Sequence, residues 1–144
     1  MTVHLIKLCV GAESIEDLAQ WQARRLKEQK KRGVKKPTLM HVTRATPKRA
    51  EDVLDGGSLY WVIKGQIAVR QRLLALKPVT KNGGPHCGLV YDKALVPVLR
   101  RSHRPFQGWR YLEPADAPAD LRIPKGGKGL PEALHAELVS LGLL

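Results

Sequence analysis

Two runs of β-branched, apolar and aromatic residues stand close together in the middle of the chain, at residues 58–64 and 66–76, and only a Lys64-Gly65 turn separates them. Because valine, isoleucine and aromatic residues favour strands, and a short glycine-containing loop favours a tight reversal, the sequence predicts an antiparallel hairpin here. Any fold of this chain must therefore contain a sheet that extends from this hairpin.

The other strands are predicted from shorter runs of the same composition. Pro97 lies inside one of them and places that strand at a sheet edge or a bulge, because proline has no N–H to donate. We predict strands at residues 3–10, 38–44, 89–91, 95–100 and 109–112, with loops at 81–87 and 115–129.

Helices are predicted from capping residues and helical spacing. Ser14 can cap a helix that ends at Gly33, with apolar residues on one face and basic residues on the other. Pro47 suits the first position of a short helix that runs to Leu54, and residues 131–141 indicate a third helix.

These elements predict one α+β domain over residues 1–144, which is long enough to bury a core without disulfides. Strands outnumber helices and the central hairpin is antiparallel. We therefore expect a small, curved, mostly antiparallel sheet or a half-open barrel, flanked by helices.

Positive charge is concentrated in the middle of the chain. The whole chain has 25 Lys+Arg against 13 Asp+Glu, a net charge of +12, and residues 21–110 hold 21 of those bases against 5 acids. A field of this kind attracts polyanions, so the charge predicts a nucleic-acid partner. The alternative is a basic soluble protein with no such role.

The stretch 100–111 places four arginines among three aromatic residues without an acid. Arginine pairs with phosphate and stacks on rings, so this composition favours RNA. We expect Phe106 in the core and Arg104 and Arg110 facing a ligand, or else paired with acids such as Asp92 or Glu113.

Two registers of the central hairpin stay open. With a two-residue loop, Trp61 lies opposite Ala68 and shares a sheet face with Arg70 and Arg72; with a three-residue loop, Tyr60 shares that face with Arg70 instead. Either ring is a base-stacking platform if it is exposed and a core contact if it is buried. The two rings point to opposite faces, so at most one of them is a platform.

The segment 24–36 adds a basic helix end with eight bases and one acid, more than the helix dipole alone requires. From these patterns we predict phosphate contacts and stacking rings at Arg24, Arg25, Lys27, Lys30, Lys31, Trp61, Arg70, Arg72, Arg100, Arg101, Arg104, Trp109 and Arg110.

Catalytic, metal and cofactor patterns are weak. His86 and Cys87 are adjacent on an extended chain, so their side chains diverge and do not form a nucleophile–base pair. The cysteines and histidines show no metal-ligand spacing, and no glycine-rich run matches a P-loop. We therefore expect neither a metal nor a cofactor.

The chain shows no membrane-spanning run and no secretion signal, and its two cysteines are too few for a disulfide framework. We accordingly expect a cytoplasmic protein with no membrane partner.

The segments HLIKLCVG, GGSLYWVIKGQIAVRQ and RPFQGWRYL, followed by DAPADL, resemble a family of short, functionally uncharacterised bacterial proteins. Residues 47–71 are also similar, more distantly, to the PUA-like superfamily with its ASCH and EVE domains. That similarity implies a barrel-like fold and RNA or modified bases as ligands. The ASCH-type G-x-K-x-x-E-x-R motif is missing, so no ligand residue is carried over.

The leading hypothesis is a noncatalytic RNA-binding domain of the PUA-like type, linked to RNA modification or to the ribosome. A first alternative is an enzyme acting on a nucleotide or another anionic small molecule, with His103, His86 or Asp92 as acid–base groups. A second alternative is an interaction module for an acidic protein, which predicts an exposed apolar patch.

Overall fold

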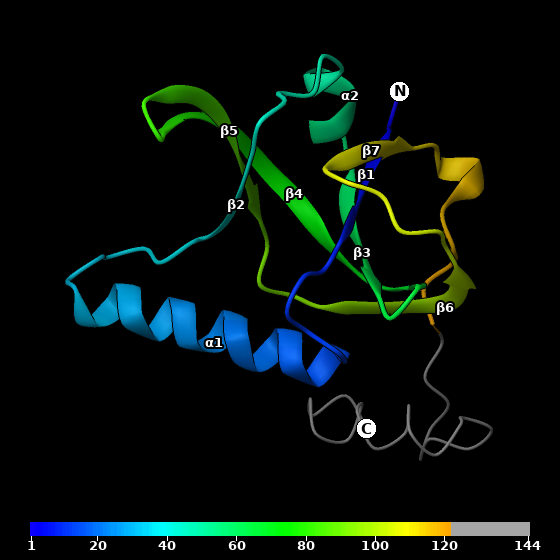
Figure 1. The fold of residues 1–144 in the computed structure, drawn as a ribbon, viewed down its shortest axis with the longest axis horizontal. Helices are drawn as coiled ribbons and strands as arrows, with labels where there is room; N and C mark the ends of the chain where they lie inside the picture. The colour runs from blue at the N-terminus through cyan, green and yellow to red at the C-terminus, as the bar shows by residue number, and fades with distance from the viewer. Residues whose placement is uncertain (122–144) are drawn as a thin grey trace.

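A seven-stranded sheet organises the part of the chain that the computed structural model describes, residues 1–121 (Figure 1). Its strands are β1 (His4–Leu8), β2 (Leu39–Thr43), β3 (Ser58–Ile63), β4 (Gln66–Lys81), β5 (Gly84–Tyr91), β6 (Val96–Ser102) and β7 (Trp109–Leu112). The described residues also form two α-helices, α1 (Ile15–Lys31) and α2 (Ala50–Leu54), and a 3₁₀ turn, η1 (Pro114–Asp116). The predicted helix at 131–141 lies outside the described residues.

The long strand β4 is the centre of this sheet. One edge of β4 pairs with β3, while the other pairs with β6 along its first half and with β5 along its second half. The main path of the sheet runs β2-β5-β4-β3-β1-β7, and among the described strands only β1 and β3 pair in parallel. This open, mostly antiparallel sheet with helices confirms the predicted α+β class.

The central hairpin is confirmed, and its register combines the two predicted ones: it has the two-residue turn of the first and, farther from the turn, the pairing of Tyr60 with Arg70 of the second. Lys64 and Gly65 form the two-residue turn with positive φ angles of 50° and 74°, as a type I′ turn requires. An irregularity then shifts the register so that Trp61 lies opposite Val69, not Ala68. Tyr60 therefore lies opposite Arg70, although the loop has only two residues.

The predicted loop at 81–87 is wrong. β4 continues to Lys81 and β5 begins at Gly84, so these residues form a second hairpin around Asn82-Gly83, whose φ angles are 53° and 76°. Asn-Gly is a strong signal for such a turn. Pro78 is tolerated because the second half of β4 has only β5 as a strand neighbour among the described residues.

The first predicted helix is confirmed and the second is shorter than predicted. The Ser14 hydroxyl accepts a hydrogen bond from the backbone N–H of Asp17 at 3.1 Å, which caps α1. α2 begins at Ala50, because Arg49 has a non-helical backbone and its N–H donates to the Tyr111 hydroxyl. Pro47 is therefore not the first residue of this helix.

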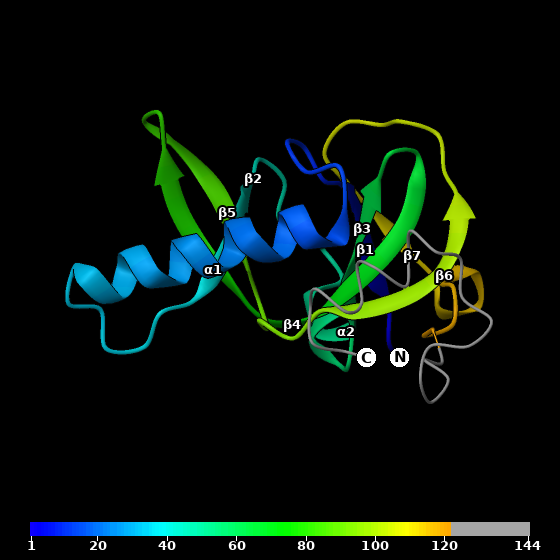
Figure 2. The same ribbon diagram turned by 90° about the horizontal axis from the view of Figure 1, so that it is seen from below.

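The sheet is covered on both faces. On one face, Ile15 and Leu18 of α1 pack in a cluster with Trp61 and Leu89, and Figure 2 shows α1 crossing this face. On the other face, Ile6 and neighbouring apolar residues form a second cluster that contains Phe106, as predicted.

A buried amide pair joins α1 to the sheet. Gln22 of α1 and Gln71 of β4 exchange two hydrogen bonds of 2.8 and 2.7 Å. Gln71 also accepts from the Trp61 indole N–H at 2.9 Å and donates to the backbone carbonyl of Asp92 at 2.9 Å. The two glutamine side chains, the Trp61 indole and the Asp92 carbonyl thus all have hydrogen-bond partners around the buried Gln71. Because only one position of α1 on the sheet satisfies all of them, the network fixes the helix.

We expect Gln71→Leu to lower the free energy of unfolding by about 3 kcal/mol, because the Trp61 N–H, the Gln22 amide and the Asp92 carbonyl all lose a buried partner. Gln22→Leu should lower it by only about 1–2 kcal/mol, because Gln71 keeps two of its partners. Urea unfolding measures both values. The exposed Gln20→Leu on the same helix is the matched control, and equal effects at positions 22 and 71 would contradict this reading.

Candidate functional site

The sheet register separates the predicted binding residues into two groups on opposite faces. Arg70 and Arg110 lie on one face, in a row with Tyr60 and Ile6 across four strands. The next row carries Trp61, Lys7 and Trp109 on the opposite face, where α1 packs. The basic helix and the arginines of β4 and β7 therefore do not form one surface.

The Arg70 guanidinium is engaged in an ion pair with Asp120. Its guanidinium donates to both carboxylate oxygens of Asp120, at 2.7 and 2.8 Å, and to the Ser58 hydroxyl at 3.1 Å. The Arg70 hydrogen bonds lower the pKa of the Asp120 carboxyl. This bidentate pair fastens the segment after η1 to the sheet.

The remaining predicted arginines after β3 differ in their surroundings. The Arg110 guanidinium lies 5.1 Å from the centroid of the Phe106 ring, and Arg101 donates to the backbone carbonyl of Asp116. Arg72, Arg100 and Arg104 are exposed. Glu113, one of the acids considered for Arg104 and Arg110, pairs with Arg49 at 2.8 Å.

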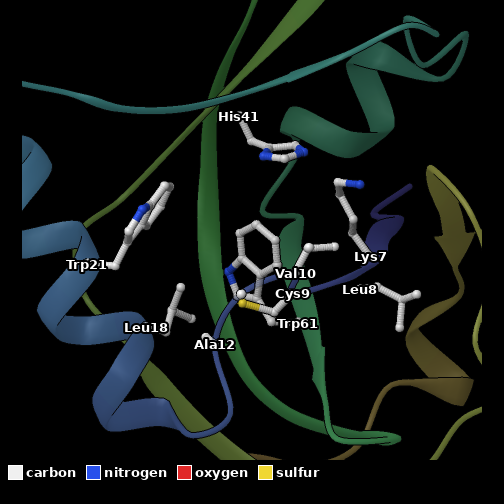
Figure 3. Close-up of a pocket in the computed structure, with 10 residues that line it drawn as sticks. Lys7, Leu8, Cys9, Val10, Ala12, Leu18, Trp21, His41 and Trp61 are labelled. Atoms are coloured by element: carbon white, nitrogen blue, oxygen red, sulfur yellow. The ribbon is translucent and has the colours of Figure 1, made fainter.

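Of the two alternatives for the hairpin rings, the structure shows the core contact, because Tyr60 and Trp61 are each only 4% exposed. Trp61 forms the floor of a cleft of about 180 Å³ that we call the Lys7 cleft (Figure 3). Trp21 of α1, His41 of β2 and Lys7 of β1 surround it, and the β1–α1 loop completes it with Cys9, Val10, Gly11 and Ala12. The fold thus brings together three parts of the chain that are distant in sequence, namely residues 7–21, His41 and Trp61.

The Lys7 cleft is apolar at its floor and basic at its rim. Burial lowers the pKa of Lys7, and among residues 1–121 its ammonium has no carboxylate within ion-pair distance. Burial, together with the charges on Lys7, Lys81 and Arg25, lowers the pKa of His41 to about 4. His41 is therefore neutral at physiological pH and can donate or accept a hydrogen bond.

Cys9 is not a nucleophile in this setting. Burial raises the pKa of its thiol to about 11, so the thiol stays protonated at neutral pH. The Trp61 ring meets the rings of His41 and Tyr91 edge to face, with centroid distances of 5.9 and 5.8 Å. The floor of the cleft is accordingly an aromatic cluster.

A wider groove of about 720 Å³ adjoins the Lys7 cleft, and Lys7 lines both. We call it the Trp109 groove; it lies between the edge strands β2 and β7 and is lined by Arg44, Thr43, Gln107 and Trp109. The Trp109 indole N–H donates to the backbone carbonyl of Ala45 at 2.8 Å, which links the two edges and fixes the ring.

Of the predicted basic residues of α1, Arg25 lies nearest to the cleft in the contacts of the described residues. Arg24, Arg25, Lys27, Lys30 and Lys31 are all exposed. The Arg25 guanidinium lies 4.8 Å from the centroid of the Trp21 ring, and Trp21 is 38% exposed at the rim of the cleft. The helix therefore extends the basic rim away from the cleft.

The sequence does not predict that Lys7, Trp21, His41 and Arg44 belong to this site. Lys7 and His41 lie inside apolar strands, where a single polar residue gives no pattern at the level of sequence. Trp21 precedes the basic helix segment by three residues and could have been included from its i, i+4 spacing to Arg25.

The acid–base residues considered for an enzyme are not assembled in the described residues. His86 and His103 each contact a nearby backbone carbonyl, of Gly84 and Arg104 respectively. The cavity beside Arg70 is lined by His4, Tyr60 and the segment after η1, without Arg104 or either of these histidines.

Within residues 1–121 no group of His, Cys, Asp and Glu side chains is arranged to hold a metal ion, and no helix is long and apolar enough to cross a membrane.

Residues 5–144 match the family described as "Protein of unknown function (DUF1489)". The chain belongs to this family. The match agrees with the resemblance to a functionally uncharacterised family, and it assigns no activity. Searches of curated proteins and of solved structures gave no significant match.

The low pKa of His41 makes the stability of this family member depend on pH. The imidazole has a pKa of 6.5 as a reference and about 4 in the folded protein, so the unfolded chain binds its proton more tightly. The contribution of His41 to the free energy of unfolding is complete above the pKa that its ring has in the unfolded chain. This contribution is lost as the pH falls through the pKa of the ring in the folded protein. We expect the free energy of unfolding to fall by about 1–2 kcal/mol through His41 as the pH is lowered over this range, less than the full shift implies because the ring is partly exposed.

Urea unfolding of the wild type and of His41→Gln at several pH values checks this expectation. The difference between the two proteins isolates His41 from His4, whose pKa burial also lowers. The wild type should lose more stability than the variant between neutral and acidic pH. Parallel curves would show that His41 titrates normally.

Proposed function

We propose that this protein is a noncatalytic RNA-binding domain that binds RNA on the sheet face that carries the Lys7 cleft and α1. The observation that carries the proposal is Lys7, a half-buried ammonium between two aromatic-lined hollows, with no acidic partner among the described residues. A half-buried ammonium is less well hydrated than an exposed one, so pairing with an anionic ligand stabilises it more.

The surroundings of Lys7 support an extended anionic ligand rather than a single small anion. Lys81 and Arg25 contribute positive potential at His41, and Arg44 lines the adjoining groove. The exposed bases of α1 continue this positive surface. A phosphate backbone offers several charges in succession and so matches a row of separate cations.

Aromatic side chains favour nucleic acid over other polyanions. Trp21 is partly exposed at the cleft and Trp109 is partly exposed in the groove, so both offer rings to a base. The similarity of residues 47–71 to the PUA-like superfamily supports the same proposal, because its members typically bind RNA. We also propose that the protein acts in the cytoplasm, where its two free cysteines would stay reduced.

Two charge-matched triple variants test which face binds. The first is Lys7→Gln, Arg25→Gln and Arg44→Gln, around the cleft; the second is Arg72→Gln, Arg101→Gln and Arg110→Gln, on the opposite face. We expect the first to weaken binding of a labelled mixed-sequence single-stranded RNA at least tenfold and to reduce the log–log salt slope by about 2, because each phosphate contact contributes roughly 0.7.

The second variant removes the same number of charges, so it controls for the net charge of the protein. Its affinity should stay within about threefold of the wild type, since long-range attraction alone is weakened. Fluorescence anisotropy over a salt series measures both variants, with circular dichroism to verify folding. No binding of the wild type at low salt, or a larger loss in the second variant, would overturn the proposal.

A further inference from the structure

The Lys7 cleft and the Trp109 groove lie on either side of one lysine. β1 is the middle strand of three, with Trp61 of β3 on one side of Lys7 and Trp109 of β7 on the other. Because neighbouring strands are about 4.8 Å apart, the two tryptophan backbones are about 10 Å apart, with the Lys7 backbone midway. Two aromatic subsites therefore flank the strand position of Lys7, and Lys7 lines both hollows.

This spacing is too large for two stacked bases. Successive bases in a stacked strand are about 3.4 Å apart along the axis, so two bases that occupy both subsites must separate from each other. Bases in a duplex are stacked and paired, and they cannot leave the helix without losing both interactions. The geometry selects a single strand whose bases point apart, with the intervening phosphate near Lys7.

The Lys7 cleft has the size and chemistry for one base. Its volume of about 180 Å³ is below the 300–1,000 Å³ typical of pockets for drug-sized ligands, which leaves room for a single ring system. Leu18 and Ala12 supply apolar contacts, and His41, whose ring nitrogens have no hydrogen-bond partner among the described residues, supplies a polar edge. A neutral imidazole can read the hydrogen-bonding edge of a base.

The Trp109 groove is wider and suits a stacked base. The hydrogen bond from the Trp109 indole to Ala45 holds the ring in one orientation, so little side-chain freedom is lost when a base stacks on it. Arg44 and Thr43 line the same groove and can contact the next phosphate and ribose.

We propose that this site takes two consecutive, unstacked nucleotides of single-stranded RNA, with one base in the Lys7 cleft, the next on Trp109, and the phosphate between them on Lys7. This inference rests on the proposed function and specifies its ligand. It requires no covalent step.

Short homopolymers of A, C and U, roughly ten nucleotides long, test the inference, since single-strand binding sites span about 4–16 nucleotides. The probes are each labelled homopolymer, the A–U duplex of the same length, and an abasic strand of the same length. We expect at least one homopolymer to bind the intact protein ten or more times more tightly than the duplex and the abasic strand.

Paired variants of Trp109 separate stacking from structure. Trp109→Leu removes the ring and should weaken homopolymer binding about tenfold, whereas Trp109→Phe keeps an aromatic face but loses the bond to Ala45 and should bind within about threefold of the wild type. On the abasic strand both variants should equal the wild type, because no base is present to stack.

The outcomes distinguish the two proposals. If no homopolymer binds at low salt, the proposed RNA-binding function fails and this inference fails with it. If a homopolymer binds but the duplex or the abasic strand binds equally well, or if Trp109→Leu has no effect on the homopolymer, RNA binding stands and the two-nucleotide site is overturned. Loss of homopolymer binding in Trp109→Phe as severe as in Trp109→Leu also overturns it, because the ring would then act only through its structural bond.

Discussion

The reciprocal amide pair between Gln22 and Gln71 is the interaction on which the candidate site depends. It sets the position of α1 on the sheet, and α1 supplies Trp21 and Leu18 to the Lys7 cleft. The same Gln71 oxygen accepts from the Trp61 indole and so orients the floor of the cleft. Since all these groups are buried, a shift of the helix would leave several polar atoms without partners. The cleft is therefore built into the packing of the core.

The register of the central hairpin determines the charge of each face. The irregularity after Trp61 places Tyr60 opposite Arg70, and this puts Arg70 on the face where Asp120 can pair with it. Lys7 lies on the other face, between two tryptophans and without an acidic partner among the described residues. A change of register by one residue would exchange these faces. The positive charges are therefore found on both faces of the sheet. One face carries arginines, of which Arg70 is paired with Asp120, and the other carries the cations around the Lys7 cleft.

Local signals in the sequence predict much of the fold. The Lys64-Gly65 hairpin, the Ser14 cap and the edge position of the strand with Pro97 are all determined by nearby residues, and the structure contains each of them. Asn82-Gly83 is an equally local signal for a hairpin, but the neighbouring Gly84 and Pro85 favour a loop instead. The site was harder to predict, because Lys7, His41 and Trp21 meet only through long-range packing. The exposed bases of α1 were found from charge alone, whereas no local pattern distinguishes a half-buried lysine in a strand.

The three tryptophans of the chain give the most direct test that the Lys7 face binds RNA, because Trp21 and Trp61 line the cleft and Trp109 lines the groove. Their indole N–H signals can be followed by NMR while a single-stranded RNA oligonucleotide is added to the wild-type protein. If RNA binds as proposed, the Trp21 and Trp109 signals shift in proportion to the bound fraction, and the backbone amides around Arg110 and in β6 change little. Unchanged indole signals, together with shifts confined to β6 and the segment that follows it, would contradict the proposal.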